Sequence, residues 1–244
     1  MDDSLTWTPA ALTGRSRDHV VDLGEPRCTL HRDVVEPFLR LRAAARQDGI
    51  DLVPVSSFRD FARQVSIWNA KCQGERELLD RNGLPLDALA LSEDRRVEAI
   101  LHWSALPGAS RHHWGTEIDV IDAAALPAGE PVRLVTAEYA EGGRFAHLDR
   151  WLERSAAECG FYRPYRRDRG GVQPEPWHLS YAPVAGQALA KFSLGLLREA
   201  LVDAGIAAPE AVARRLPEIY QRYVLNVDPP PWAQPLNAPG STPS

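Results

Sequence analysis

Two adjacent histidines, a glycine and two aspartates fall within the thirteen residues SRHHWGTEIDVID, which run from Ser110 to Asp122. Zinc sites in enzymes usually take three protein ligands and leave a fourth position for water. His112 and Asp119 are seven residues apart, so an unbroken strand would place them on opposite faces. Gly115 lies between them and permits a turn that brings both to one point. The segment therefore offers two candidate metal ligands.

A third ligand must come from another part of the chain, and His178 in PEPWHLSY is the best candidate. Glu175 precedes it by three residues, and Pro176 and Trp177 stiffen the link between them. This spacing lets a carboxylate stand beside a metal-bound water without being a ligand itself. Such a carboxylate can take the proton of the water and pass it to a leaving amine. The residue types thus point to metal-assisted hydrolysis.

The two motifs SxHxxGxxxD (residues 110–119) and ExxH (residues 175–178) resemble the D-alanyl-D-alanine carboxypeptidase family of zinc peptidases. This family includes the vancomycin-resistance D,D-carboxypeptidases and shares its fold with lysostaphin-type endopeptidases and the hedgehog signalling domain. The resemblance covers roughly residues 30–182. SSFRDFARQ (residues 56–64) is similar to the family's Ser-x-aromatic-Arg segment. One departure is Glu117, where many relatives have a small residue or Asp; this position is not a ligand.

The resemblance implies a zinc site with three ligands: His112, Asp119 and His178. It implies that Glu175 is the catalytic base. Arg59 would hold the carboxylate of the substrate or stabilise the charged tetrahedral intermediate, as a guanidinium can. Ser110 and Gln64 would line the substrate site. By the same resemblance, His113 and Trp114 would form the wall that packs the ligand loop.

The implied activity is that of a zinc-dependent peptidase with one Zn²⁺ per chain. It would hydrolyse D-amino-acid-containing peptidoglycan peptides by attack of a metal-bound water, so a peptidoglycan-derived peptide is the expected partner. Two alternatives remain open: a non-catalytic, hedgehog-like zinc-binding module, and a peptidoglycan endopeptidase of the same fold. The presence of Glu175 and Arg59 counts against the first, because a structural zinc site needs neither.

Two residue assignments also have alternatives. His113 could replace His112 as a ligand, because the two are adjacent in the sequence. Arg59 could instead pair with a nearby acid such as Asp60 at the start of a helix.

Composition excludes several classes of protein. The formal net charge of −5 argues against binding to nucleic acid. No apolar run approaches the roughly 20 residues that a membrane-spanning helix needs. The three cysteines are widely spaced and form no CxxC motif, so the sequence suggests neither a thiolate zinc site nor a redox pair. We expect a cytoplasmic protein, because the N-terminal residues lack an apolar signal core; export by another route stays open. No protein partner is evident.

The periodicity predicts an α+β fold, in which a small antiparallel sheet carries the zinc site, helices flank it and a helical addition follows. The expected strands are residues 50–57, 117–122 and 176–181, and the expected helices are residues 32–49, 59–71, 147–160, 186–204 and 209–224. Residues 73–96 should form a loop or lid with helical pieces. The expected organisation is an extended N-terminal lead-in (1–29), a zinc peptidase domain (30–182), a helical C-terminal extension (183–227) and a Pro-rich loose tail (228–244).

Overall fold

A four-stranded antiparallel sheet lies at the centre of the computed structural model, which describes residues 7–127 and 129–233. Its strands follow the order β3-β6-β8-β7. They are β3 (Leu52–Ser56), β6 (Glu117–Asp122), β7 (Phe161–Tyr162) and β8 (His178–Tyr181). Every neighbouring pair runs antiparallel. The predicted α+β class with a small antiparallel sheet is confirmed.

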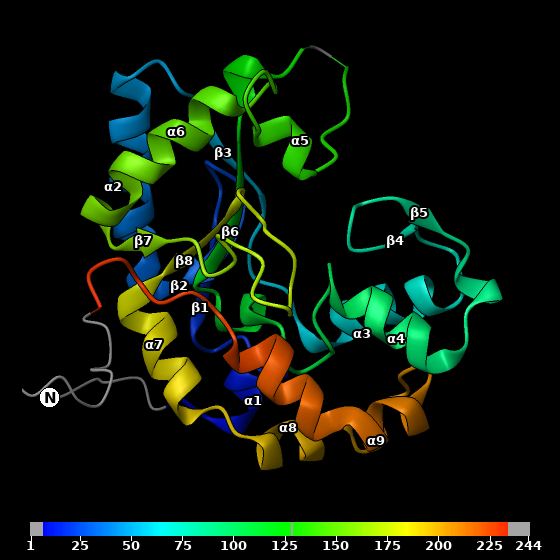
Figure 1. The fold of residues 1–244 in the computed structure, drawn as a ribbon. Coiled ribbons are helices and arrows are strands. Elements are labelled where there is room, and N and C mark those ends of the chain that lie inside the picture. Colours follow the sequence, from blue (N-terminus) through cyan, green and yellow to red (C-terminus); the bar gives the residue numbers. More distant parts are fainter. Residues whose placement is uncertain (1–6, 128, 234–244) are drawn as a thin grey trace, which may run out of the picture.

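Helices α2 (Val35–Gln47) and α6 (Ala146–Ser155) lie on the same side of this sheet (Figure 1). In α2, Phe38, Leu41 and Ala45 recur at helical spacing and are all buried. They share an apolar cluster with Ile118 of the sheet and Trp151 of α6. Burial of this cluster fixes one face of β6 against the helices and leaves the other face to polar side chains.

A second group of helices surrounds another apolar cluster, which includes Trp68 and Trp114. They are α1 (Pro9–Leu12), α3 (Phe61–Cys72), α4 (Glu93–Leu101), α7 (Ala182–Lys191), α8 (Leu194–Leu201), α9 (Pro209–Ile219) and the π-helix η6 (Tyr220–Leu225). The helix expected over residues 186–204 is divided, because Phe192 adopts extended backbone angles between α7 and α8. The C-terminal helices thus share a core with α1, α3 and α4, while the proposed domain boundaries stay a prediction.

The expectation of an extended lead-in is wrong for the secondary structure of residues 7–29. Besides α1, the strands β1 (Val20–Leu23) and β2 (Cys28–His31) form an antiparallel hairpin. Trp7 and Leu12 are buried in the second cluster. Elements of four residues are too short to show a periodic pattern, which is why the sequence pattern did not reveal them.

Shorter elements complete the fold. Residues 73–96 contain a small hairpin of β4 (Leu78–Leu79) and β5 (Pro85–Leu86) and then the 3-10 helix η2 (Ala88–Ala90). The other short helices are η1 (Arg32–Val34), η3 (Arg111–Trp114), η4 (Ala123–Ala125), α5 (Thr136–Tyr139) and η5 (Ala156–Cys159). Among the described residues, no helix combines the length and the apolar character needed to cross a membrane.

The predicted tail begins later than residue 228. Asp228 is buried and pairs with Arg167 and Arg169 at 2.8 and 3.3 Å. Trp232 is half exposed. The rest of the predicted tail, residues 234–244, lies outside the described residues.

His31 is a buried histidine at the end of β2, and it should make the stability of the protein depend on pH. Burial lowers its pKa to about 4; Asp33 opposes this shift, while His19 and Arg32 add to it. An unfolded histidine has a pKa of about 6.5, so the unfolded chain binds the extra proton as the pH falls below that value. The contribution of neutral His31 to the free energy of unfolding is therefore fully present above about pH 6.5, and it is lost progressively as the pH falls towards 4.

We expect the free energy of unfolding of the wild type to fall by about 2 kcal/mol more than that of His31→Gln between pH 6.5 and pH 4. Urea denaturation at a series of pH values measures this difference. His147→Gln, at an exposed position, is the control and should follow the wild type. Parallel curves for the wild type and His31→Gln would contradict the assignment.

Candidate metal and active site

Strands β6 and β8 place four polar side chains on one face of the sheet. Glu117 pairs with Ser180, and Asp119 pairs with His178, across the two strands. Because side chains alternate along a strand, residues two apart share a face. All four side chains are buried, although they are polar. This face is where the chemistry of the site is assembled.

The turn at Gly115 brings His112 to the same face. His112 lies in η3, and Gly115 ends that helix with a φ of 68°, in the left-handed region. A Cβ on Gly115 would lie 2.5 Å from Val20 Cγ1 and 2.7 Å from the backbone nitrogen of His31. Both the backbone angle and the close contact therefore require glycine. The turn predicted at this position is confirmed.

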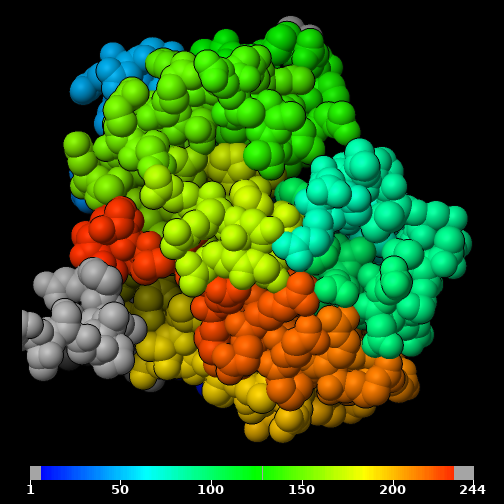
Figure 2. All heavy atoms as spheres, in the orientation of Figure 1, coloured from blue at the N-terminus to red at the C-terminus, as the bar shows by residue number. Residues whose placement is uncertain are grey.

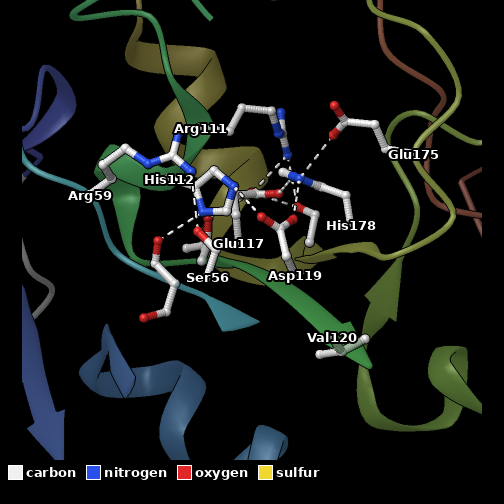
Figure 3. A network of polar contacts seen from close by, with 12 residues as sticks. Ser56, Arg59, Arg111, His112, Glu117, Asp119, Val120, Glu175 and His178 are labelled. Atoms are coloured by element: carbon white, nitrogen blue, oxygen red, sulfur yellow. Dashed lines mark hydrogen bonds and ion pairs between the residues drawn. The ribbon is translucent and has the colours of Figure 1, made fainter. Parts of the chain in front are cut away.

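His112, Asp119 and His178 meet in a buried cluster in which the three candidate ligand atoms lie within 4.8 Å of one another. His112 Nε2 is 3.4 Å from Asp119 Oδ2, and His178 Nδ1 is 3.0 Å from Asp119 Oδ1. Figure 3 shows the three side chains pointing toward one another. Two imidazole nitrogens and one carboxylate oxygen form a donor set that suits zinc. Within the described ranges, this is the one such group.

Hydrogen bonds at the far side of each ring indicate which nitrogen faces the cluster. His112 Nδ1 donates to the backbone oxygen of Ser57 at 2.8 Å, which leaves Nε2 free. His178 Nε2 lies 2.8 Å from Glu117 Oε2 and donates to it, while Nδ1 faces Asp119. Groups that bond the other ring nitrogen fix the tautomer of a metal-binding histidine.

The side chains of the cluster shift one another's pKa values. Burial alone would lower the pKa of His178, but hydrogen bonds to Asp119 and Glu117 raise it to about 10. Burial would raise the pKa of Asp119, yet His112 and His178 hold it well below its usual range. Burial lowers the pKa of His112, against the attraction of Asp119. The two carboxylates therefore favour positive charge at this point of the cluster, which is the charge that a metal cation would supply.

Glu175 stands beside the three-residue group. Its Oε2 is 3.4 Å from His178 Nδ1 (Figure 3). Burial raises the pKa of Glu175 to about 7, and the positive charge of His178 opposes this rise. A carboxylate with a pKa near neutrality can both accept and donate a proton.

Arg59 also lines the cavity, beside His112 in Figure 3, and neutral partners hold its guanidinium. Its guanidinium donates to Gln64 Oε1 at 2.8 Å and to Ser56 Oγ at 3.1 Å. Burial lowers the pKa of Arg59, while Asp119 and Glu175 oppose that shift. The alternative pairing with Asp60 is not seen; Asp60 instead accepts from the backbone nitrogen of Arg63 and caps α3.

The two expected substrate-contacting residues differ in their positions. Ser110 is on the wall of a cavity of about 650 Å³ that also reaches Asp119 and Glu175. Gln64 is not on that wall, because its amide is used within the protein: Oε1 accepts from Arg59, and Nε2 donates to the backbone oxygen of Ala105 at 2.7 Å. The structure therefore corrects the expectation for Gln64, which supports Arg59.

His113 and Trp114 pack the ligand loop, as expected. His113 Nδ1 donates to the backbone oxygen of Arg59 at 2.6 Å, and its Nε2 accepts from the backbone nitrogen of Gly108 at 3.1 Å. Trp114 Nε1 donates to the backbone oxygen of Leu12 at 3.1 Å. Since both ring nitrogens of His113 are occupied, His112 is the histidine of the pair that faces the cluster.

The cavity opens between two peripheral segments. Residues 76–83, around the β4–β5 hairpin, form one rim, and residues 133–137 form the other. In Figure 2 these segments, coloured teal and green, face each other across a hollow in the surface. Its cationic lining residues are Arg59, Lys71, Arg76, Arg111 and Arg133, and its acidic ones are Glu77, Asp119 and Glu175. The wall therefore carries more positive than negative side chains, in a chain of net charge −5.

Comparison with known proteins agrees with this geometry. Residues 27–184 match the family described as VanY, D-alanyl-D-alanine carboxypeptidase. A relative from Haemophilus influenzae, named only as an uncharacterized protein, is 44% identical over 105 residues, which cover 42% of this chain and 72% of the relative. A D-alanyl-D-alanine carboxypeptidase of Enterococcus faecalis is 25% identical over 154 residues, covering 62% of this chain and 47% of that protein.

The fold is also found among solved structures. A mutant of the vancomycin-resistance D,D-pentapeptidase VanY, in complex with Zn(II), is 23% identical with a TM-score of 0.50. The match covers 75% of this chain and 88% of that one. At this identity the likeness shows a shared fold. With the family match across residues 27–184, it follows that the chain belongs to the VanY family of D-alanyl-D-alanine carboxypeptidases.

Proposed function

We propose that the protein is a zinc-dependent carboxypeptidase that removes the terminal D-alanine from D-Ala-D-Ala-ended peptidoglycan peptides. The observation that carries the proposal is the buried group of His112, Asp119 and His178, with Glu175 beside it, at the wall of a cavity large enough for a peptide end. Family membership and the Zn(II) found in the VanY structure support it.

In this proposal His112, Asp119 and His178 would hold one zinc ion per chain, with Nε2 of His112 and Nδ1 of His178 facing it. Bound there, zinc would polarise a carbonyl group and lower the pKa of a water molecule. Glu175 accepts a proton at its carboxylate and delivers it to the departing amine, a task for which a pKa near 7 is suited. Arg59 supplies positive charge either to the substrate carboxylate or to the tetrahedral intermediate. Ser110 contributes to the substrate wall.

A panel of peptides tests the activity. The zinc-loaded protein is incubated with muropeptides that end in D-Ala-D-Ala or in D-Ala-L-Ala, and the released amino acid is measured. We expect release of the terminal amino acid from the D-Ala-D-Ala peptides and none from the D-Ala-L-Ala peptides. Cleavage inside cross-linked peptides would indicate an endopeptidase instead. Zinc binding without hydrolysis of any peptide would favour the non-catalytic, hedgehog-like module.

The charge of the cavity predicts a preference for anionic peptides. Neither Arg59 nor Lys71 forms an ion pair with a carboxylate in the part of the chain that the structure describes. Burial and the neighbouring Arg76 lower the pKa of Lys71 to about 8, so it still carries its charge at pH 7. A partly buried ammonium group of this kind can bind a substrate carboxylate with little competition from water.

Lys71→Met should lower kcat/KM about tenfold for peptides with free carboxylates, the loss expected for one charge-assisted hydrogen bond. For the same peptides with amidated carboxylates, the substitution should change kcat/KM little. Lys191→Met, at an exposed position on α7, is the matched control and should behave as the wild type. An equal loss for acidic and amidated peptides would show that Lys71 does not bind a carboxylate.

A further inference from the structure

Glu117 is a fully buried carboxylate that does not line the cavity. Its Oε2 accepts from His178 Nε2 at 2.8 Å. Its Oε1 accepts from Ser180 Oγ at 2.8 Å and from Thr116 Oγ1 at 2.9 Å. Both oxygens therefore have partners on fixed elements, and Figure 3 shows the side chain on the far side of His178 from Glu175. The carboxylate contacts a candidate ligand and no substrate-accessible surface.

Arg111 holds this carboxylate from the opposite direction. Its Nη2 is 3.2 Å from Glu117 Oε1, donates to Ser180 Oγ at 2.8 Å and lies 3.2 Å from the hydroxyl of Tyr162. The guanidinium also lies over the ring of Trp114, 4.8 Å from its centre. A buried ion pair contributes little net stability, because desolvation offsets its attraction. Two apolar side chains would pack equally well at these positions. The ion pair of Arg111 and Glu117 therefore points to a role in orienting a neighbouring group.

The orientation matters because a neutral imidazole carries one proton on two nitrogens. Two carboxylates compete for that proton: Asp119 at 3.0 Å from Nδ1, and Glu117 at 2.8 Å from Nε2. With the proton on Nδ1, His178 would donate to Asp119 and would have no lone pair toward the cluster. With the proton on Nε2, the lone pair of Nδ1 faces Asp119 and His112.

We propose that Glu117, oriented by Arg111 and Ser180, is a positioning residue that keeps the proton of His178 on Nε2 and presents Nδ1 to the metal. This inference rests on the proposed metal site and extends it to three residues outside the cluster of candidate ligands, Glu117, Arg111 and Ser180. Glu117 acts through His178 and takes no part in binding the peptide.

The test measures zinc affinity and the tautomer of His178. Glu117→Gln keeps the size of the side chain but can offer an N–H to Nε2 and so favour the wrong tautomer. Its zinc dissociation constant should rise about 10- to 100-fold, the usual cost of losing a group that holds a metal ligand. Two-dimensional ¹H–¹⁵N NMR of the zinc-loaded wild type should show a protonated Nε2 on His178, and Glu117→Gln should lose or shift that signal. Glu117→Asp, which keeps the charge, should retain more affinity than Glu117→Gln.

Glu138→Gln is the matched control, because Glu138 is also buried and lies 3.4 Å from an arginine, Arg144, without contacting the cluster. Its zinc affinity should equal that of the wild type. If Glu117→Gln does not fold, Ser180→Ala removes one hydrogen bond to Glu117 and should still weaken zinc binding. Wild-type affinity in both the Glu117→Gln and the Ser180→Ala variants, or an unchanged Nε2 signal in Glu117→Gln, would overturn the inference.

Failure of the inference and failure of the proposed function give different results. A wild type that binds zinc through Nδ1 of His178 but cleaves no peptide would overturn the peptidase proposal and leave the role of Glu117 intact. A wild type that cleaves D-Ala-D-Ala peptides, together with a Glu117→Gln variant of unchanged zinc affinity, would do the reverse. A wild type that binds no zinc overturns both.

Discussion

Glu175→Gln should lower the turnover of a D-Ala-D-Ala-ended peptide by at least about 100-fold, while the protein keeps its zinc. The amide has the size of the carboxylate but cannot accept a proton, and loss of a general base typically costs roughly 10²- to 10⁴-fold in rate. Zinc should stay bound, because Glu175 is not one of the three residues of the cluster. Steady-state kinetics and elemental analysis on the same preparation measure the two quantities together.

Glu77→Gln provides the control for this variant. Glu77 also lines the cavity, but it is exposed and does not belong to the cluster of candidate ligands. The same chemical change there should leave turnover within a few-fold of the wild type. If Glu175→Gln retained wild-type turnover with zinc bound, the base would have to be another group, and the proposed role of Glu175 would be wrong.

The local part of the site could be predicted from the sequence. His112, Gly115 and Asp119 lie within one short segment, so their relation depends on one turn and one strand. The turn can be predicted because glycine adopts left-handed backbone angles without strain, and Gly115 lies between the two candidate ligands. In contrast, the pairing of Asp119 with His178 joins positions far apart in the chain. No local pattern specifies that pairing: the residue types make His178 a candidate third ligand, and the family resemblance implies that it shares a metal with Asp119.

The roles proposed for Glu117 and Arg111 do not follow from the sequence motifs. Glu117 departs from the family pattern and is not a ligand, so the family resemblance implies no role for it. A signal was present: Glu117 and Asp119 are two apart in a strand, so they share a face, and a buried acid there needs a partner. The identity of that partner depends on the register of β6 with β8, which places Ser180 opposite Glu117. Register of this kind depends on tertiary packing.

The position of Gln64 in the structure differs from the expectation that it lines the substrate site, for a related reason. Helical spacing on α3 places Gln64 on the buried side of the helix, near the start of α3 and Arg59. Whether such a side chain reaches the cavity or is used within the protein depends on the nearby loop, and here Ala105 supplies the acceptor. Buried amides are satisfied by whichever groups the fold brings close.

His178→Ala should lose most of its zinc, and this variant tests the metal site more directly than any kinetic measurement. It removes one of the two imidazole nitrogens of the cluster and leaves Asp119 and His112 in place. Changes in groups that merely hold a ligand already weaken metal binding about 10- to 100-fold, so loss of a ligand should weaken it by at least about 100-fold. Competition with a chromophoric chelator measures the dissociation constant, and elemental analysis measures the zinc content after dialysis.

His102→Ala is the matched control for this variant. His102 is another buried histidine, but it packs beside Tyr223 and does not line the cavity. Its zinc content should remain about one per chain, as expected for a catalytic site of three ligands. His113→Ala extends the comparison, because the nitrogens of His113 are bonded to Arg59 and Gly108 and do not face the cluster. Full zinc occupancy in His178→Ala would contradict the ligand assignment. Zinc loss in His113→Ala, with zinc retained in His112→Ala, would show that His113 is the ligand in place of His112.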